Sequence, residues 1–452
     1  MESSPEEWFV APVPSTSPLF ATFEASFRPL LSAYFTGRSF SAFAHLLSLK
    51  IPTNREQLEI PSIVIFVSEG DRVNQVYDDV IGLLDPIEEF KGFVLSVADG
   101  EYSGMMEDDM QCKLYHTTAQ SGVSIGFKNC AATTGPLLST SNENYTITVA
   151  HLFTALSLDG KAKVVLDDGT GCKVTQPVYA DFLEEKSFLE KSLARSRMQL
   201  GSASEAGKQN IMSRMKERQT RLDQLMALGA NREEFESNAE FGEVVRFKYS
   251  TEVVCGRRRR FDYALLRITK REIDPGMLLW NIGPAPREGQ LCEEDWENSA
   301  LKRFGNMKFD LDVWKAGRGT GVTFGRVAGN MGVNYISGGD VTDEFWVLRD
   351  SSFKDWKPFA SEGDSGSLVV SREGIGCGMV LGAWRSFGRA FRMPIDPSTR
   401  LWDLRSLPSL RRPDGNLDLS RTVSEILHRG VIIVSCMESI LNDIRMDFTP
   451  VA

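Results

Sequence analysis

Residues 361–370 read Ser-Glu-Gly-Asp-Ser-Gly-Ser-Leu-Val-Val (SEGDSGSLVV), a glycine-rich turn that runs into an apolar stretch. The glycines at 363 and 366 permit a tight turn that points the backbone N–H groups of Gly363 and Ser365 at one spot. Such turns also occur without function, because Ser-Glu-Gly-Asp recurs at residues 68–71 of the same chain. Ser365 is therefore a candidate nucleophile only if the chain also supplies a base and an orienting acid.

Two residues beside predicted strands meet that requirement. His151 follows the alternating run Tyr145–Ala150, and Asp262 directly precedes the apolar run Tyr263–Ile268. Serine attack on a carbonyl needs a base to take the hydroxyl proton, an acid to orient that base, and N–H donors for the oxyanion. Taken singly, a histidine at a strand end is more often structural, and an acid before a strand is often a turn or cap residue.

Together, the three residues lie in motifs with a known order. Thr148-Val-Ala-His151 resembles T-A-A-H, Asp262-Tyr-Ala-Leu-Leu266 resembles D-I-A-L-L, and Gly363-Asp-Ser-Gly-Ser367 resembles G-D-S-G-G of the chymotrypsin/trypsin-like serine proteases. The order His, Asp, Ser distinguishes that family from other triad hydrolases. The resemblance covers about residues 120–447 and implies a mostly β, chymotrypsin-like double β-barrel with the active site between the barrels.

The resemblance also implies roles. His151 would be the base, Asp262 would orient it, and Ser365 would attack, with the N–H groups of Gly363 and Ser365 as the oxyanion hole. The implied substrate-binding positions are Phe359, Leu381, Gly382, Ala383 and Gly430. Of these, Leu381 to Ala383 would form the edge that pairs with the substrate backbone.

Two departures from the family bear on specificity and activation. Phe359 stands six residues before Ser365, where tryptic members carry an acid, so we expect an apolar or small P1 residue. No Arg or Lys precedes the segment 123–126, so activation through a new amino terminus that pairs with Asp364 is not expected. We expect Asp364 to contact an internal cation or backbone donors, and the full-length protein to be active without trimming.

The pattern of elements predicts two domains. Residues 1–115 form a small α/β domain, with helices from Leu19 and around 40–49, a strand at 63–67, a helix at 73–84 and a strand at 93–97. Residues 1–18 are expected to be a loose arm, and Pro29 to interrupt the first helix. Residues 116–452 form the protease-like domain, with a helical insertion at 179–240 and a second insertion at 386–429.

The helical insertion has an apolar stripe of Ile211, Met215, Leu222, Leu225 and Met226, and a weaker one of Phe182, Leu189 and Leu193. Gly201–Gly207 is expected to be a flexible link within a helical hairpin. The stripe either packs on the β domain or binds a partner or regulatory protein.

Composition narrows the compartment and the partners. The formal net charge of −10 argues against nucleic acid as the main partner. The sequence contains no run of about 18 apolar residues, so we expect no membrane span. The start resembles no signal peptide, and seven cysteines without a CxxC pair indicate a cytoplasmic or nuclear protein with reduced thiols. Among the four histidines no pair has metal-ligand spacing, so we expect neither a metal nor a cofactor.

For several other residues we expect a structural role rather than a functional one. Arg257–Arg260 could be an import signal or a proteolytic site, but a solvated hairpin tip after Gly256 is the expectation. His45, His116 and His428 lie in no motif and are expected to be structural.

Three functions follow from the sequence. The first is a serine endopeptidase acting on protein or peptide substrates, with possible regulation through the amino-terminal domain or the helical insertion. The second is a catalytically silent protease-fold interaction module, which the long insertions and the unusual amino-terminal domain leave open. The third, a non-peptide acyl hydrolase, is disfavoured by the order of the three residues.

Overall fold

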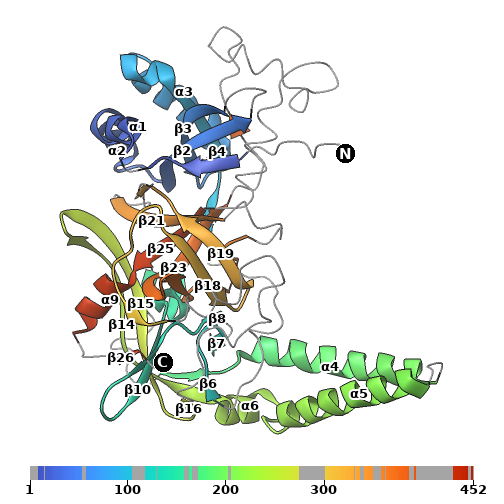
Figure 1. The fold of residues 1–452 in the computed structure, drawn as a ribbon. Coiled ribbons are helices and arrows are strands. Elements are labelled where there is room, and N and C mark those ends of the chain that lie inside the picture. The colour runs from blue at the N-terminus through green and yellow to red at the C-terminus, as the bar shows by residue number, and fades with distance from the viewer. Residues whose placement is uncertain are drawn as a thin grey trace.

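The computed structural model describes residues 9–14, 16–52, 57–103, 118–128, 130–156, 162–164, 172–201, 205–273, 301–329, 331–335, 341–349, 358–361, 363–385, 391–392, 431–445 and 449–450 (Figure 1). Within them the protein is mostly β, with several sheets and helices on their periphery, which is the coarse class predicted from the sequence. His116, His428 and Gly430 lie outside the described residues.

One large sheet contains eight strands in the order β26-β9-β10-β15-β14-β13-β7-β8. Their bounds are β7 Ser124–Phe127, β8 Cys130–Thr133, β9 Leu137–Ser139, β10 Asn144–Thr148, β13 Lys173–Thr175, β14 Glu240–Val254, β15 Arg257–Ile268 and β26 Thr449–Pro450. Short pairs lie beside it, with β6 Thr118–Ala119 on β16 Glu272–Ile273, and β11 Thr154–Leu156 on β12 Ala162–Val164. This sheet carries His151 and Asp262.

A second sheet of fourteen strands joins the amino-terminal and carboxy-terminal parts of the chain. Its carboxy-terminal strands are β17 Arg303–Phe304, β18 Asp312–Gly317, β19 Gly321–Val327, β20 Gly332–Tyr335, β21 Val341–Arg349, β22 Leu368–Ser371, β23 Ile375–Arg385, β24 Phe391–Arg392 and β25 Val431–Cys436, which helix α9 Met437–Ile444 follows. β20 pairs antiparallel with β2 (Ala42–Pro52), and β24 pairs with β4 (Val94–Asp99). The two parts therefore share one continuous hydrogen-bonded sheet.

The amino-terminal part is a helix-covered sheet (Figure 1). β3 (Gln57–Val67), α3 (Val73–Leu84) and β4 form the expected β-α-β unit, and β3 and β4 are parallel. The first helical stretch runs through α1 (Pro18–Thr22), a π-helical turn at Phe23–Phe27 and α2 (Arg28–Phe35). The interruption lies just before Pro29, in the π-helical turn where the Arg28 N–H bonds five residues back to the Phe23 carbonyl, and Pro29 itself is in the first turn of α2.

The helix predicted at residues 40–49 is wrong, because the chain forms strand β2 there. Ala42, Ala44 and Leu46 face the core beneath the helices, whereas Phe43 and Leu47 face the core of the other part of the molecule. Because both faces of β2 pack against apolar cores, its sequence does not alternate regularly between apolar and polar residues, and its apolar run can be mistaken for a buried helix.

The expected loose arm and flexible link are also partly wrong. Phe9–Pro12 form strand β1 on β2, so the arm is anchored within the described residues. Helix α5 (Glu205–Met226) already includes Glu205–Gly207 of the expected link.

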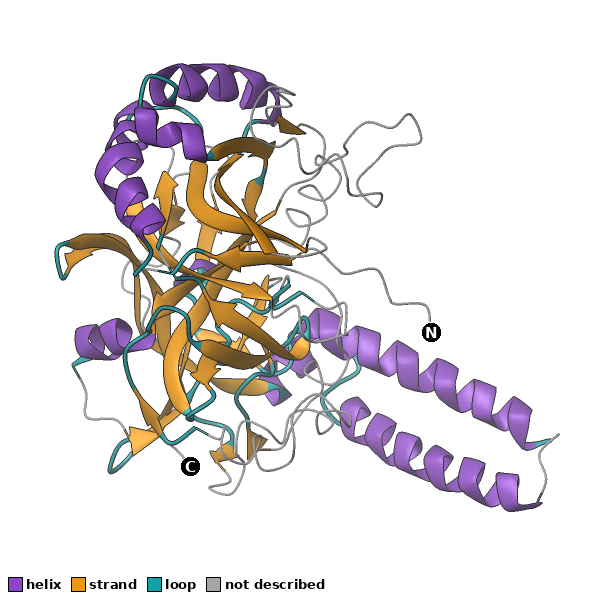
Figure 2. Cartoon of the chain, turned by 45° about the horizontal axis from the view of Figure 1, so that its top comes forward, coloured by secondary structure: helices purple, strands orange, loops and turns teal. Residues whose placement is uncertain are grey.

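Helices α4 (Tyr179–Leu200) and α5 fall within the segment 179–240 where the sequence predicts helices, and they project from the sheets as an antiparallel pair (Figure 2). At their base, α6 (Arg232–Asn238) closes a separate small core of Phe182, Leu189, Leu225, Leu228, Phe235 and Ala239. The apolar stripes therefore pack mainly among the three helices, although Met226 is exposed.

The prediction of a solvated tip for Arg257–Arg260 is only partly right. Cys255 and Gly256 have φ of 51° and 75°, so they form the expected tight hairpin turn between β14 and β15. Of the four arginines, however, only Arg258 is exposed. The contacts of the others are Arg257 with Glu24 (3.6 Å), Arg259 with the Asp343 carbonyl (3.2 Å) and Arg260 with Glu344 (3.8 Å). The hairpin tip thus contacts the amino-terminal helical stretch and β21, where the half-buried Glu24, the buried Glu344 and a backbone carbonyl supply acceptors.

His45 on β2 is fully buried between aromatic rings. Its ring lies 4.7 Å from Trp346 and 5.6 Å from Phe66, centroid to centroid, and among the described residues neither ring nitrogen has a hydrogen-bond partner. Burial lowers the pKa of His45 to about 3. His45 is therefore neutral in the folded protein and becomes protonated in the unfolded chain below pH 6.5.

We expect His45 to make the protein less stable in acid. Since only the unfolded state takes up this proton between pH 6.5 and pH 3, the free energy of unfolding falls with falling pH, by about 2 kcal/mol from this residue between pH 7.5 and pH 5. Urea unfolding of the wild type and of His45→Phe at both pH values measures the effect. The difference between the two pH values should shrink by that amount in His45→Phe, and an unchanged difference would contradict the buried neutral imidazole.

Candidate active site

His151 and Asp262 are in direct contact. The His151 Nδ1 lies 2.7 Å from one carboxylate oxygen of Asp262, and the His151 backbone N–H donates to the other oxygen at 2.9 Å. Asp262 is 1% exposed. Burial alone would raise the pKa of Asp262, but the charge and hydrogen bonds of His151, and then the charge of Arg260, lower it below its usual value. The carboxylate stays ionised and holds His151 at two points, the ring Nδ1 and the backbone N–H.

The register of the sheet explains this contact. β10 pairs antiparallel with β15, and Thr148 lies opposite Ala264. Asp262, two residues before Ala264 in the sequence, therefore lies just beyond the end of β10. A 3₁₀ turn at Ala150–Leu152 then ends β10 and brings His151 back over Asp262. Antiparallel pairing therefore places the two residues together although 111 positions separate them in the sequence.

The turn at Gly363–Gly366 packs against the same sheet. Gly363 and Gly366 have φ of 91° and 97°, values that favour glycine. A Cβ on Gly366 would lie 2.3 Å from the Thr133 carbonyl oxygen and 2.6 Å from the Thr148 Oγ1, so no other residue fits. The Thr133 N–H also donates to the Ser365 carbonyl at 2.8 Å. Ser365 thus lies beside strands β8 and β10, the second of which leads to His151.

The hydroxyl of Ser365 has a different partner from the one the motif suggests. It donates to the Leu381 carbonyl at 2.9 Å and makes no hydrogen bond to the His151 ring. Rotation about the Cα–Cβ bond of Ser365 redirects this hydroxyl without any backbone movement. Among the described residues, neither the Gly363 N–H nor the Ser365 N–H donates to a protein acceptor, so both are available to an incoming oxygen.

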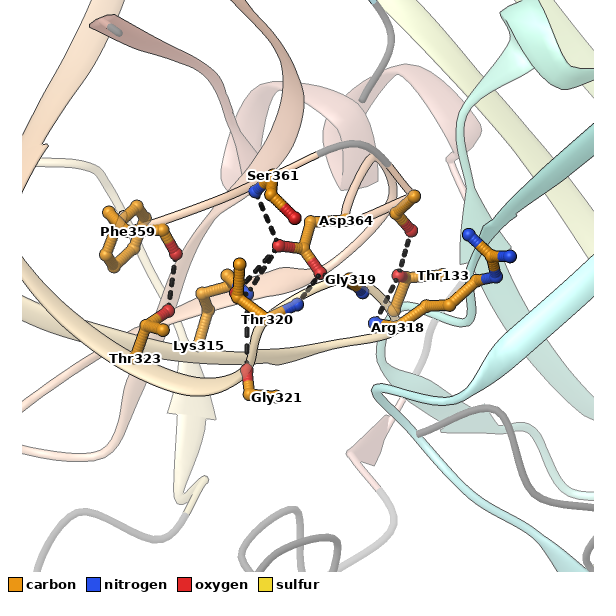
Figure 3. Close-up of polar contacts among 11 residues, drawn as sticks. Thr133, Lys315, Arg318, Gly319, Thr320, Gly321, Thr323, Phe359, Ser361 and Asp364 are labelled. Atoms are coloured by element: carbon orange, nitrogen blue, oxygen red, sulfur yellow. Dashed lines mark hydrogen bonds and ion pairs between the residues drawn. The ribbon is translucent and has the colours of Figure 1, made fainter. Parts of the chain in front are cut away.

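Asp364 is held by an internal cation and by backbone donors, as its motif predicts (Figure 3). The Lys315 Nζ lies 2.9 Å from its carboxylate, and both side chains are completely buried. The other donors are the Ser361 N–H (2.8 Å), the Gly319 N–H (2.7 Å), the Thr320 N–H (3.3 Å) and the Thr320 hydroxyl (2.8 Å). The sequence signal for Lys315, a lone lysine in the apolar run of β18, was not recognised.

The expected substrate-binding residues are differently placed. Phe359 is 1% exposed and belongs to the core that packs on the carboxy-terminal strands of the fourteen-stranded sheet. Leu381 adjoins Ser365 through its carbonyl, and Leu381 and Ala383 are buried on β23. Strand β5 (Glu101–Ser103), just after β4, pairs antiparallel with this part of β23, with Ser103 opposite Ala383. Part of the edge expected for substrate is therefore paired with the protein's own chain.

Neither a metal cluster nor a membrane helix is found in the described parts of the chain. No three His, Cys, Asp or Glu side chains there are placed to hold a metal ion. No helix there is long and apolar enough to cross a bilayer.

Comparison with known proteins finds no matching family model and no matching curated protein. Solved structures of chymotrypsin-like serine proteases match weakly. A glutamic acid specific serine protease is 11% identical over 72% of this chain and 97% of that chain, with a TM-score of 0.31. Thermobifida fusca Protease A is 13% identical over 63% and 95%, with a TM-score of 0.29. Nocardiopsis Protease is 11% identical over 72% and 95%, with a TM-score of 0.32. Likeness at this level carries no information about activity.

We expect Lys315→Met to destabilise the protein strongly. Removing the ammonium leaves the Asp364 carboxylate buried without its counter-charge, which costs about 3–5 kcal/mol of unfolding free energy. Guanidinium unfolding measures this loss, and Lys315→Met combined with Asp364→Asn should recover much of it. The matched control is Lys173→Met, which breaks a pair of 2.8 Å with Glu240 at a lysine that is 68% exposed, and should cost less than about 1 kcal/mol. Equal losses in the two single variants would contradict the buried pair.

Proposed function

We propose that the protein is a serine endopeptidase that hydrolyses peptide bonds through His151, Asp262 and Ser365. The observation that carries the proposal is the two-point contact between Asp262 and His151, at 2.7 Å and 2.9 Å, beside the glycine turn that bears Ser365. A buried, ionised carboxylate on Nδ1 fixes the tautomer in which Nε2 accepts a proton. This is the arrangement that a general base requires, and the glycine turn bearing Ser365 packs on β10, the strand that leads to His151.

In the proposed reaction, the Ser365 hydroxyl turns from the Leu381 carbonyl to the His151 Nε2, which takes its proton as Oγ bonds to the substrate carbonyl carbon. The carbonyl π electrons move to the oxygen, which the N–H groups of Gly363 and Ser365 stabilise by about 3–4 kcal/mol per donor. The C–N bond then breaks as His151 returns the proton to the leaving amine. Water attacks the acyl-enzyme by the same steps, and releases the acid and the free serine.

The alternative is a silent protease-fold module that binds proteins without cleaving them. The hydrogen bond from Ser365 to Leu381 is the observation that favours it, because the nucleophile is directed away from the base. We favour the enzyme, since catalytic hydrogen bonds are often loose in unliganded sites and tighten only with substrate. An apolar or small P1 residue is part of the proposal.

We expect a fluorophosphonate probe to label the wild-type protein and not Ser365→Ala. Ser367→Ala is the matched control, because its hydroxyl lies two residues away and has no partner among the described residues, so its removal should leave labelling intact. In-gel fluorescence of the labelled protein provides the measurement. Wild-type protein that no fluorophosphonate labels would support the silent module.

Asp262→Asn should lower kcat for peptide anilides about 10⁴-fold with little loss of stability, since an amide favours the wrong imidazole tautomer. Steady-state kinetics and a thermal melt of the same sample separate the two effects. A variant within tenfold of wild-type kcat would rule out the proposed role of Asp262.

The full-length chain should be active without cleavage near residue 122. Because Lys315 already neutralises Asp364 within the intact chain, a new amino terminus is not needed to order the turn. Mass spectrometry before and after an activity assay tests this expectation. Activity that appears only in a fragment starting near residue 122 would refute it.

A further inference from the structure

One buried ion pair joins the projecting helices to the turn that bears Ser365. The Arg318 Nε and Nη2 atoms donate to the two carboxylate oxygens of Asp181 at 2.7 Å and 2.5 Å. Asp181 lies in the first turn of α4 and is 1% exposed, and the Arg318 side chain is 7% exposed. Two parallel N–H···O bonds fix both the position and the plane of the guanidinium.

Arg318 contacts the expected oxyanion-hole glycine on its other side. A Cβ on Gly363 would lie 2.4 Å from the Arg318 Nη1, so the guanidinium packs directly on the Cα of Gly363. The Arg318 backbone N–H donates to the Thr133 Oγ1 at 3.0 Å, and that hydroxyl donates to the Gly363 carbonyl at 2.6 Å (Figure 3). The Cα of Gly363 is thus held by the side chain of Arg318, and the Gly363 carbonyl is held, through Thr133, by the Arg318 backbone.

Asp181 is what makes this arrangement electrostatically stable. Burial works to lower the pKa of Arg318, but the hydrogen bonds and charge of Asp181 outweigh it and raise that pKa. Asp181 is also stabilised by the positive end of the α4 dipole. A buried guanidinium without Asp181 would move toward water or another acceptor, and would leave Gly363 unsupported.

The same helix offers a matched comparison. Glu185, one turn farther along α4, pairs with Arg221 of α5 at 2.7 Å, and Glu185 is 2% exposed. This pair holds α4 to α5, and among the described residues no hydrogen bond or ion pair joins it to the Gly363–Gly366 turn. Both pairs use a buried carboxylate of α4, although Arg221 is 24% exposed and Arg318 only 7%, and they differ in whether they reach the candidate active site.

We propose that Asp181 and Arg318 are positioning residues that hold the Gly363 N–H in the orientation that stabilises the oxyanion. The helical insertion would thereby set the catalytic efficiency of the site although it supplies no reacting group. This inference rests on the proposed peptidase function and deepens it, because it assigns the insertion a role in the transition state.

The test compares full-length wild type, Asp181→Asn and Arg318→Lys with the control Glu185→Gln. Kinetics use chromogenic peptide anilides with Ala, Leu or Phe at P1. In the first two variants kcat should fall about 10- to 100-fold while KM changes less than about threefold, since an oxyanion donor acts mainly in the transition state. Arg318→Lys keeps the positive charge but loses the two parallel N–H donors of the guanidinium. It provides the test if Asp181→Asn does not fold.

A second measurement separates positioning from general damage. A peptidyl trifluoromethyl ketone forms a hemiketal oxyanion on the serine, whereas the matching alcohol binds without one. Affinity for the ketone should fall by the same factor as kcat in Asp181→Asn and Arg318→Lys, while affinity for the alcohol and all constants of Glu185→Gln stay near wild type.

Two results would overturn the positioning role. One is an equal loss of kcat in Asp181→Asn and Glu185→Gln, and the other is an equal loss of affinity for the ketone and the alcohol. Wild-type protein that neither cleaves the anilides nor binds the ketone would overturn the proposed function instead. The two failures are distinguishable because the first requires an active wild type.

Discussion

The absence of a side chain at Gly366 is the constraint on which the candidate active site depends. With a φ of 97° and with the Thr133 carbonyl and Thr148 Oγ1 where a Cβ would lie, this residue lets the turn before β22 approach strands β8 and β10 of the eight-stranded sheet closely. Ser365 precedes it directly, and His151 lies three residues after Thr148. The position of Ser365 relative to His151 is therefore fixed in part by this close approach at Gly366.

Two buried ion pairs flank this turn, Asp364 with Lys315 and Asp181 with Arg318. Such pairs contribute little net stability, because the cost of removing both charges from water offsets most of their attraction. They do select one arrangement, since any displacement leaves a charge buried without its partner. Asp364 illustrates this point, because five donors surround its carboxylate and so hold the Gly363–Gly366 turn in place.

The sequence predicts the local parts of the site better than its long-range partners. The glycine turn and the short motifs around His151 and Asp262 can be recognised locally, because the residues of each motif are neighbours in the chain, although antiparallel pairing of β10 with β15 is what joins the two motifs. Lys315 lies 49 positions from Asp364, and Arg318 lies 137 from Asp181, so no local pattern connects them. Strand β2 was missed for a related reason, since its apolar run reflects two cores contributed by distant segments. The buried environment of Arg260 likewise depends on Glu344 of a distant strand.

Strand β5 has a consequence for whatever extended chain approaches β23. A peptide that used the same edge opposite Ala383 would compete with a segment tethered to the molecule by β4 on its amino-terminal side. Tethering makes the effective concentration of that competitor independent of how dilute the protein is. A ligand that binds this edge in place of β5 must therefore have a binding free energy larger than that of the tethered strand. This requirement sets a lower limit on its affinity.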